Sequence, residues 1–553
     1  MKKAMKMRAA WLSVAGLTLL AACGGNDNNE AANENAGAEN NNDNDNVEVN
    51  DGGNNEEVDE DLAEANEMLD DGTLVIAMGT DMVSWDVHDH GNTSTEAVHV
   101  NVFDYMFKRA EGTMEIEPHL VEDYETIEED VWEFTLRDDV YWHNGDQLTA
   151  EDVKFTFDRV LGDDSLSEHA RFTQLGEIEV LDEFTLRFNT DGPQPTILNR
   201  LAQTGAGIIP KDYIEENGID EFLENPIGTG PYEFVEWERD DRVVLSKYDD
   251  YFLGDDYTEW DEVVFRAIPE SSTRVGELLT GGAHVVTDIP PNEWPRVDDE
   301  PGTSHVSAES NRTMLIIARQ TEGSPGSDPR VLEAIEYAID NEAITEQVMS
   351  GSAVPTRTRV LPGNVGANEE LFDTYLYDPD HARDLLAEAG YEDGLELTMQ
   401  SPQGRYLMDS DIAEVIAGMV GEVGIDLNVE FLEWSQFIEH YQNNTNDDLM
   451  LLGLATSLYD AAQALDHYYS DSPLNEGRMD WVNEDFDELF FAAETNMDPD
   501  ERLEQYLEAQ ELVAEGRPHI YLHSINMNFG VNDELDYTPR HDEIYYVNEI
   551  RRR

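Results

Sequence analysis

The sequence predicts a mixed α/β fold, because it combines strand-like alternation with several well-marked helix starts. Residues 132–136 and 184–188 alternate apolar and polar side chains, which is the period of a half-buried strand. Residues suited to capping a helix stand at Thr149, Asp328 and Asp378. No repeat of fixed period is visible. A domain built from both kinds of element is therefore expected.

The three predicted helices share a start signal and an apolar stripe. Asp152 follows Thr149 in the capping-box position. Asp328 and Asp378 each precede a proline, which favours the first turn of a helix, and Gly390 can end the last of the three. The stripes that would face the core are Val153, Phe157, Val160 and Leu161; Val331, Leu332, Ile335, Ala338 and Ile339; and Ala382, Leu385, Leu386 and Ala389.

Composition indicates a large folded body with an acidic surface. The 553 residues are 40% hydrophobic and include 9 Trp, 22 Tyr and 19 Phe, enough for a sizeable core and for roughly two to four domains. Lys and Arg number 33 against 122 Asp and Glu, a net charge of −89, and the acidic residues are interleaved with apolar ones. Such a surface repels nucleic acid and anionic membranes, so neither is expected as a partner.

The choice of basic residue points to an unusual exterior. Only seven of the basic residues are lysines, and none follows Lys247. Arginine keeps its charge at a pH where lysine begins to lose it. Together with the acidity, this favours a halophilic or alkaliphilic setting.

The first residues resemble a bacterial lipoprotein signal. Four basic residues lie among the first eight, and residues 9–20 are apolar but too short for a permanent membrane span. Small residues then lead to Cys23, the only cysteine. We expect a signal peptide at 1–22, a lipid-modified Cys23 and a disordered, Asn-rich acidic linker over 23–72. The mature protein would be extracytoplasmic, held to the cell membrane by its lipid anchor alone.

Four segments carry a resemblance to a known family. Residues 132–153 read as a hairpin running into a helix and contain the block WHNGDQLTAEDV, and residues 225–232 are the glycine-rich NPIGTGPY. Residues 328–340 and 377–391 follow in order. Together they resemble the peptide/nickel-type (family 5) extracellular solute-binding proteins of ABC importers.

The resemblance implies a bilobal, periplasmic-binding-protein-like fold of type II, with three subdomains and a hinged cleft. Lobe I would combine residues 73–98, 226–316 and 522–553, with an inserted subdomain at 99–225. Lobe II would span 317–521. Ligand would be enclosed as the lobes close around it.

The resemblance places Arg405, Tyr406 and Trp434 among the ligand-binding residues of lobe II. Arg405, beside Tyr406, would hold a ligand carboxylate through paired hydrogen bonds, although a surface arginine paired with acidic residues would look the same. Trp434 would line the cleft and stack on the ligand, or else pack in the core.

The segment around Ser457 departs from the dipeptide-binding pattern. Ser457 stands where dipeptide-binding relatives have an aspartate as counter-ion to the ligand's amine. Asp460, three residues on, would then receive the polar or amine end together with Thr456 and Ser457, or the ligand presents no amine there. Dipeptide specificity is therefore left open.

Lobe I offers weaker candidates. Ser84, Trp85 and Thr93 lie where the first strand would turn into the cleft, although turn residues facing solvent would look the same. His88 and His90, together with Asp89 and His99, are side chains of the types that bind metal ions, and they form a weak candidate metal site. No bound metal or cofactor is expected, and His143 is expected to be structural.

The predicted function is that of a substrate-binding receptor for an ABC importer, which captures a short peptide or peptide-like solute outside the membrane and delivers it to the permease. The protein would be monomeric. It would not be an enzyme, since catalytic signatures such as G-x-S-x-G, H-E-x-x-H and the P-loop do not occur. The alternatives are another cargo (a nickel chelate, a glutathione-like tripeptide, an opine or an oligosaccharide), a surface metallohydrolase using the histidine loop, and a surface adhesin or sensor.

Overall fold

The computed structural model describes residue 69, residues 71–403 and residues 405–553, all within one compact unit that begins at Asn54. The predicted signal peptide, Cys23 and nearly all of the predicted linker lie outside the described residues. Within the described part, none of the helices combines the length and the apolar character that spanning a bilayer requires.

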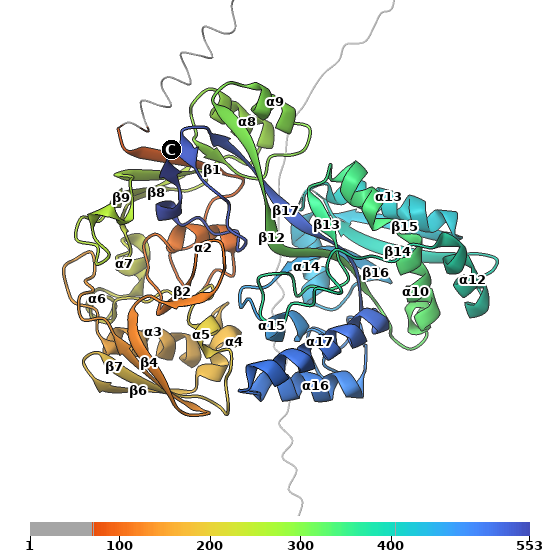
Figure 1. Cartoon of the computed structure of the whole chain (residues 1–553), viewed down its shortest axis with the longest axis horizontal. Coiled ribbons are helices and arrows are strands. Elements are labelled where there is room, and N and C mark those ends of the chain that lie inside the picture. The colour runs from red at the N-terminus through yellow and green to blue at the C-terminus, as the bar shows by residue number, and fades with distance from the viewer. Residues whose placement is uncertain (1–68, 70, 404) are drawn as a thin grey trace, which may run out of the picture. The chain divides into compact units, whose positions relative to one another are not determined.

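The largest sheet has eleven strands. In chain order they are β1 (Thr73–Met78), β8 (Tyr232–Glu238), β9 (Arg242–Lys247), β10 (Glu262–Ala267), β11 (Val285–Val286), β12 (Thr303–Ala318), β13 (Ala353–Pro355), β14 (Leu395–Pro402), β15 (Ile425–Leu432), β16 (Leu449–Ala455) and β17 (His519–Asn532). The spatial order is β15-β14-β16-β12-β17-β11-β1-β10-β9-β8, with β13 pairing on β17. The two longest strands, β12 and β17, therefore join a half built around β14–β16 to a half built around β1 and β8–β11 (Figure 1).

The pairing of β12 with β17 is interrupted in the middle. Residues 303–309 pair in one antiparallel register, residues 313–314 in a second and residues 315–317 in a third, and the three residues from Ser310 to Arg312 bulge out of the β12–β17 ladder. A bulge bends the strand and redirects its side chains. All three of these residues line a large cavity.

Both strand predictions are confirmed. β5 (Val131–Leu136) buries Trp132, Phe134 and Leu136, and β7 (Thr185–Asn189) pairs with it. They form a four-stranded antiparallel sheet in the order β4-β5-β7-β6, with β4 (Val121–Glu128) and β6 (Glu177–Asp182) at its edges.

The three predicted helices are also present. α3 (Ala150–Gly162) has the capping box of Thr149 and Asp152. α10 (Pro329–Ala338) and α12 (Pro379–Ala389) have the expected aspartate caps, and Gly390 ends α12 in the left-handed region at φ 92°. Ile339, predicted inside the second helix, is instead its C-terminal cap residue with extended backbone.

The remaining elements are shorter or cover the sheets. They are α2 (Thr93–His99), β2 (Phe107–Arg109), β3 (Ile116–Pro118), α4 (His169–Phe172), α5 (Ile197–Arg200), α6 (Lys211–Asn217), α7 (Ile219–Glu224), α8 (Ser271–Leu279), α9 (Trp294–Asp299), α11 (Asn341–Ala343), α13 (Asp409–Glu422), α14 (Trp434–Gln442), α15 (Ala461–Leu465), α16 (Glu484–Thr495), α17 (Pro499–Gly516), β18 (Leu535–Asp536) and β19 (Arg551–Arg552).

The buried apolar side chains separate into distinct clusters along the chain. One cluster runs from Met314 to Ile525. A second lies mostly between Ala97 and Ile208 around the four-stranded sheet. Two more pack on opposite sides of β1, because Leu74 and Ile76 belong to one and Val75 and Ala77 to the other. The chain thus has several cores rather than one.

The glycine-rich segment is held by close backbone contacts. A side chain at Gly228 would place its Cβ 1.7 Å from the carbonyl oxygen of Val102, so only glycine fits there. His143 links this segment to the hairpin, since its Nδ1 accepts from the Gly228 amide and its Nε2 donates to the Gly230 carbonyl. Both ring nitrogens of His143 are thus used for structure.

A buried histidine makes the stability of this fold sensitive to acid. His523 in β17 is 0% exposed, neither ring nitrogen has a hydrogen-bond partner among the described residues, and burial lowers its pKa to about 4. Below pH about 6.5 the imidazole of His523 is protonated in the unfolded chain but stays neutral in the folded chain. The free energy of unfolding therefore falls as the pH falls toward 4. We expect this residue to cost about 3 kcal/mol of stability by pH 4, and urea unfolding of His523→Leu should show a correspondingly smaller acid loss than the wild type. Equal acid losses in the two proteins would contradict this.

Candidate functional site

A large cavity lies where the bulge of β12 faces the loops of both halves of the sheet. Its volume is about 970 Å³, at the upper end of the range typical of small-molecule sites. Its walls include Ser310, Asn311 and Arg312 from the bulge and residues 525–529 of β17. Residues 405–408, the end of β16 with residues 456, 457 and 459 after it, and residues 541–546 complete it, so segments far apart in the sequence meet here.

The cavity is far more basic than the chain as a whole. Five arginines and four carboxylates line it: Arg109, Arg171, Arg274, Arg312 and Arg405 against Glu96, Asp288, Asp542 and Glu543. Over the whole sequence, by contrast, acidic residues outnumber basic ones 122 to 33. Tyrosines also line the cavity, at positions 105, 406, 459, 545 and 546. Guanidinium groups beside aromatic rings suit a solute with carboxylates and flat or apolar parts.

Arg405, predicted to bind a ligand carboxylate, lines the cavity. The carboxylate of Asp409 fixes its loop, because Oδ2 accepts from the backbone amides of both Arg405 and Tyr406, at 2.8 and 3.0 Å. The hydroxyl of Tyr406 donates to the Gly453 carbonyl at 3.0 Å, and the Arg405 guanidinium lies 4.9 Å from the centre of the Tyr406 ring. These hydrogen bonds position the backbone of residues 405 and 406, which suits a binding residue.

A second arginine stands close to the first. Arg312 pairs with Glu543 at 3.0 Å, and although burial lowers the pKa of Arg312, this carboxylate outweighs burial and raises it. Burial and the charge of Arg312 lower the pKa of Arg405. Two like charges in a partly desolvated site repel each other, so a bound anion would relieve that repulsion.

Thr456 belongs to a buried amide network at the cavity wall. Its hydroxyl accepts from the Asn311 side chain at 2.7 Å and donates to Asn364 at 3.1 Å, and Asn364 in turn donates to Asn311 at 2.8 Å. The hydroxyl therefore fixes the bulge of β12 against the 453–459 loop.

The side chain of Ser457 also faces the cavity, and a cation contacts it. Its hydroxyl accepts from Arg171 at 2.9 Å, and Arg171 also pairs with Glu168 at 2.9 Å. The neighbouring Leu458 carbonyl accepts from Arg109 at 2.7 Å. The place where a ligand amine was considered is thus bordered by two guanidinium groups.

Asp460 does not line the cavity, which corrects the expectation that it receives a ligand amine. It is 1% exposed, caps α15 through the Ala462 amide, and accepts two hydrogen bonds from Arg502, at 2.6 and 2.8 Å. Burial lowers the pKa of Arg502, but the Asp460 carboxylate outweighs it and raises that pKa. Asp460 therefore has a structural partner that the local sequence does not reveal.

The other predicted residues fall in different places. Thr93 lines the cavity, whereas Ser84 and Trp85 do not. Trp85 is 1% exposed and stacks on His99 in the core, with ring centres 5.4 Å apart, which corrects its assignment to the ligand. Trp434 is the first residue of α14, and its side chain lies outside the described part of the structure.

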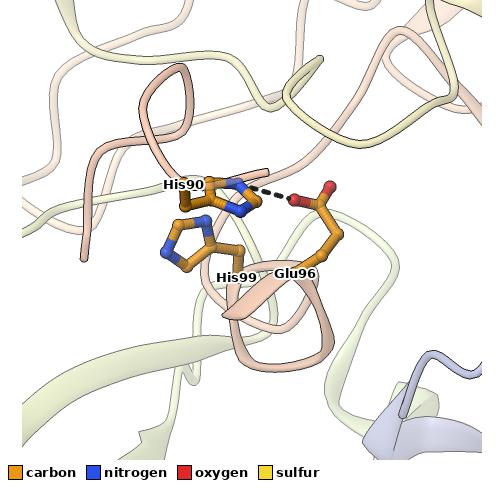
Figure 2. A group of neighbouring side chains, drawn as sticks. All are labelled: His90, Glu96 and His99. Carbon is orange, nitrogen blue, oxygen red and sulfur yellow. Dashed lines mark ion pairs between the residues drawn. The ribbon is translucent and has the colours of Figure 1, made fainter. Parts of the chain in front are cut away.

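The two histidines considered as weak metal candidates separate. His88 is fully buried beside Arg159, whose guanidinium lies 2.7 Å from its Nδ1, and it is not a member of the metal-ligand group found among the described residues. His90 is a member, together with Glu96 and His99 of α2 (Figure 2).

Several cavity residues carry no local signal in the sequence. Arg109, Arg171, Arg312 and Glu543 were not predicted, because their relevance arises only when distant segments meet. The sequence offers only one general indication of their role: where basic residues are scarce, some of the arginines are expected to bind specific partners.

The fold and the cavity define a class, that of solute-binding proteins that enclose a ligand between two lobes joined by crossing strands. The model for bacterial extracellular solute-binding proteins, family 5 (middle region), matches residues 115–476. The chain belongs to this family.

Individual relatives agree with this. The chain is 26% identical to the glutathione-binding protein GsiB of Salmonella paratyphi A over 459 residues, which cover 81% of this chain and 88% of that protein. It is also 26% identical to the dipeptide-binding protein of Escherichia coli K12, over 78% of this chain and 85% of that one. Among solved structures, the ABC transporter-associated protein DppA of Helicobacter pylori with the peptide STSA superposes with a TM-score of 0.73 at 26% identity, covering 87% of this chain and 98% of that one.

Proposed function

We propose that this protein is the substrate-binding receptor of an ABC importer and that its cargo is a short peptide or peptide-like solute carrying at least one carboxylate. The single observation on which the proposal of an anionic cargo rests is the cluster of five arginines around one cavity in a strongly acidic chain. Arg405 and Arg312 would bind a carboxylate, and Tyr406 with the other cavity tyrosines would contact the body of the solute.

The cation beside Ser457 argues against a dipeptide with its amine at that position. Arg171 contacts the Ser457 hydroxyl, and Arg109 contacts the adjacent backbone. An ammonium group there would be repelled, whereas a second carboxylate would be attracted. A glutathione-like tripeptide or another solute with two carboxylates therefore fits better than a simple dipeptide. One of the relatives is named for binding glutathione and another for binding dipeptides, so the relatives are compatible with a glutathione-like tripeptide and with a dipeptide.

The domain division also remains a proposal, with lobe I at 73–98, 226–316 and 522–553, an inserted subdomain at 99–225 and lobe II at 317–521. The separate apolar clusters support it, because one of them runs from Met314 to Ile525 and another lies mostly between Ala97 and Ile208. Strands β12 and β17 would be the hinge crossings.

We propose further that the receptor acts as a monomer without catalytic activity and is held to the membrane through a lipid on Cys23. A tether of about fifty residues would keep it near its permease and raise the local concentration without a permanent complex. A salty or alkaline exterior would explain the acidic, lysine-poor surface. A melting temperature that rises with salt would support that setting, and a salt-independent one with a neutral optimum would contradict it.

Native mass spectrometry of the purified protein tests the cargo class. Binding proteins that close around a solute can retain it, so we expect an adduct of small-molecule mass that is released on denaturation. Tandem mass spectrometry of the released molecule should identify a solute with at least one free carboxylate. A retained solute that is neutral or cationic would overturn the anionic cargo.

A further inference from the structure

Three side chains beside the cavity bring potential metal ligands together. Glu96 and His99 lie three residues apart on α2 and therefore share a face of the helix. His90 comes from the loop just before this helix, and the ligand atoms of all three lie within 4.8 Å of one another (Figure 2). This side-chain group is the one of its kind among the described residues.

His99 is already prepared as a ligand. Its Nε2 donates to the backbone carbonyl of Ser84 at 2.8 Å, so in the neutral ring the lone pair is on Nδ1. That Nδ1 is buried and has no hydrogen-bond partner in the described part of the chain. Burial lowers the pKa of His99 to about 4, which keeps the ring neutral near pH 7. A metal-binding histidine whose other nitrogen donates to a carbonyl is the usual arrangement.

Glu96 supplies a buried negative charge. It is 3% exposed, and its Oε1 accepts from the hydroxyl of Tyr105. Burial raises the pKa of Glu96, but the hydrogen bond and charge of His90 outweigh burial and lower it. Glu168, 0% exposed, adds a second carboxylate whose charge acts on His90 and is partly offset by Arg171. A cation is therefore electrostatically favoured here.

His90 is the third member of the group, and its ring must change tautomer to bind a metal. Its Nε2 lies 3.2 Å from Oε2 of Glu96, while its Nδ1 accepts from the Asn92 amide at 3.0 Å. Without a metal the ring keeps its proton on Nε2, toward Glu96. To bind a metal through Nε2, the ring must carry the proton on Nδ1 instead and give up the Asn92 contact. The intervening Gly91, at φ 57°, gives this loop the freedom to adjust.

We propose that His90, Glu96 and His99 form a binding site for one divalent transition-metal ion of the zinc class. Two imidazoles and a carboxylate are the ligands of zinc sites that keep a fourth position open. Ligands of a tetrahedral zinc ion lie about 3.3 Å apart, so the widest separation here would close by roughly 1.5 Å.

The position of the site gives it a role beyond structure. Gly91, Asn92 and Glu96 all line the solute cavity, so the ion would lie at the cavity wall. Its open position could accept a carboxylate or amine of a bound solute. The site itself does not depend on the identity of the cargo, so its test stands apart from the test of the proposed function.

Calorimetric titration with ZnCl₂ tests the site in the full chain, stripped of metal with a chelator. All variants would carry Cys23→Ala, so that the thiol cannot contribute. We expect one zinc ion per chain with a Kd in the micromolar range or below. His99→Ala and His90→Ala should each weaken binding by at least about 100-fold, and Glu96→Gln by at least about tenfold, because losing a ligand should cost no less than losing its outer-shell support.

The matched control is His381→Ala, which removes an exposed histidine of α12 and should leave zinc binding unchanged. Should His99→Ala fail to fold, the increase in melting temperature that zinc causes can be compared between Glu96→Gln and the wild type. We expect the smaller increase in Glu96→Gln. A wild-type Kd weaker than about 100 μM would overturn the proposal. So would tight stoichiometric binding that survives both His99→Ala and Glu96→Gln.

Discussion

Replacing Arg502 with methionine should destabilise the protein by about 3–5 kcal/mol, one of the two largest effects of a single substitution that we expect. The Arg502 and Asp460 side chains are 6% and 2% exposed and are joined by two hydrogen bonds. Removing the cation leaves the Asp460 carboxylate buried without its counter-charge. Urea unfolding, followed by fluorescence, measures the loss.

Two further variants separate this effect from lost packing. In the double variant Asp460→Asn/Arg502→Met no charge is left behind, and the amide oxygen of the introduced asparagine can still cap α15, so much of the stability should return. Arg383→Met breaks an exposed pair with Asp380 and should change stability by less than about 1 kcal/mol. A loss below about 1 kcal/mol in Arg502→Met would contradict a buried, structural pair.

Replacing Arg405 with alanine should weaken cargo binding at least tenfold. Arg405 lines the cavity on a loop that Asp409 holds by two backbone hydrogen bonds, so the backbone that carries the guanidinium is positioned before the solute arrives. Losing one charge-assisted hydrogen bond costs about 1.5–3 kcal/mol, and about 1.4 kcal/mol corresponds to a factor of ten. Isothermal titration with the solute identified from the purified protein measures the change.

The chemistry of the lost contact can be resolved in the same experiment. Arg405→Lys keeps the charge but not the paired geometry, so its affinity should fall between those of the wild type and Arg405→Ala. Arg383→Ala, outside the cavity lining, should bind as the wild type does. Unchanged affinity in Arg405→Ala would remove this residue from the site.

Local features of the fold were predictable because their causes are local. The capping residues Thr149, Asp328 and Asp378 act within one helical turn, and the alternation of 132–136 records one buried face of one strand. Nothing in these predictions requires knowledge of which distant segment covers that face.

The site was predictable only in part, because its determinants are not local. Arg405 and Tyr406 follow from a recognisable loop, and both line the cavity. The role of Asp460 was misjudged because its partner Arg502 lies 42 residues away on another helix. Arg312 lines the cavity from a bulge in β12, and a bulge arises from strand pairing that the local sequence does not reveal.

The metal-ligand group illustrates the same limit. A histidine-rich loop is visible in the sequence, but only the structure replaces His88 with Glu96 as a member of the group. The helix places Glu96 and His99 on one face, and the hydrogen bond from His99 to Ser84 fixes which ring nitrogen is available.

A crystal structure of the protein as purified tests the central claim most directly, namely that an anionic solute occupies the arginine-lined cavity. We expect solute density within the cavity of about 970 Å³, with a carboxylate in hydrogen-bond distance of the guanidinium group of Arg405 or Arg312. Solute bound outside this cavity, or oriented with no anionic group toward any of the five arginines, would contradict the claim.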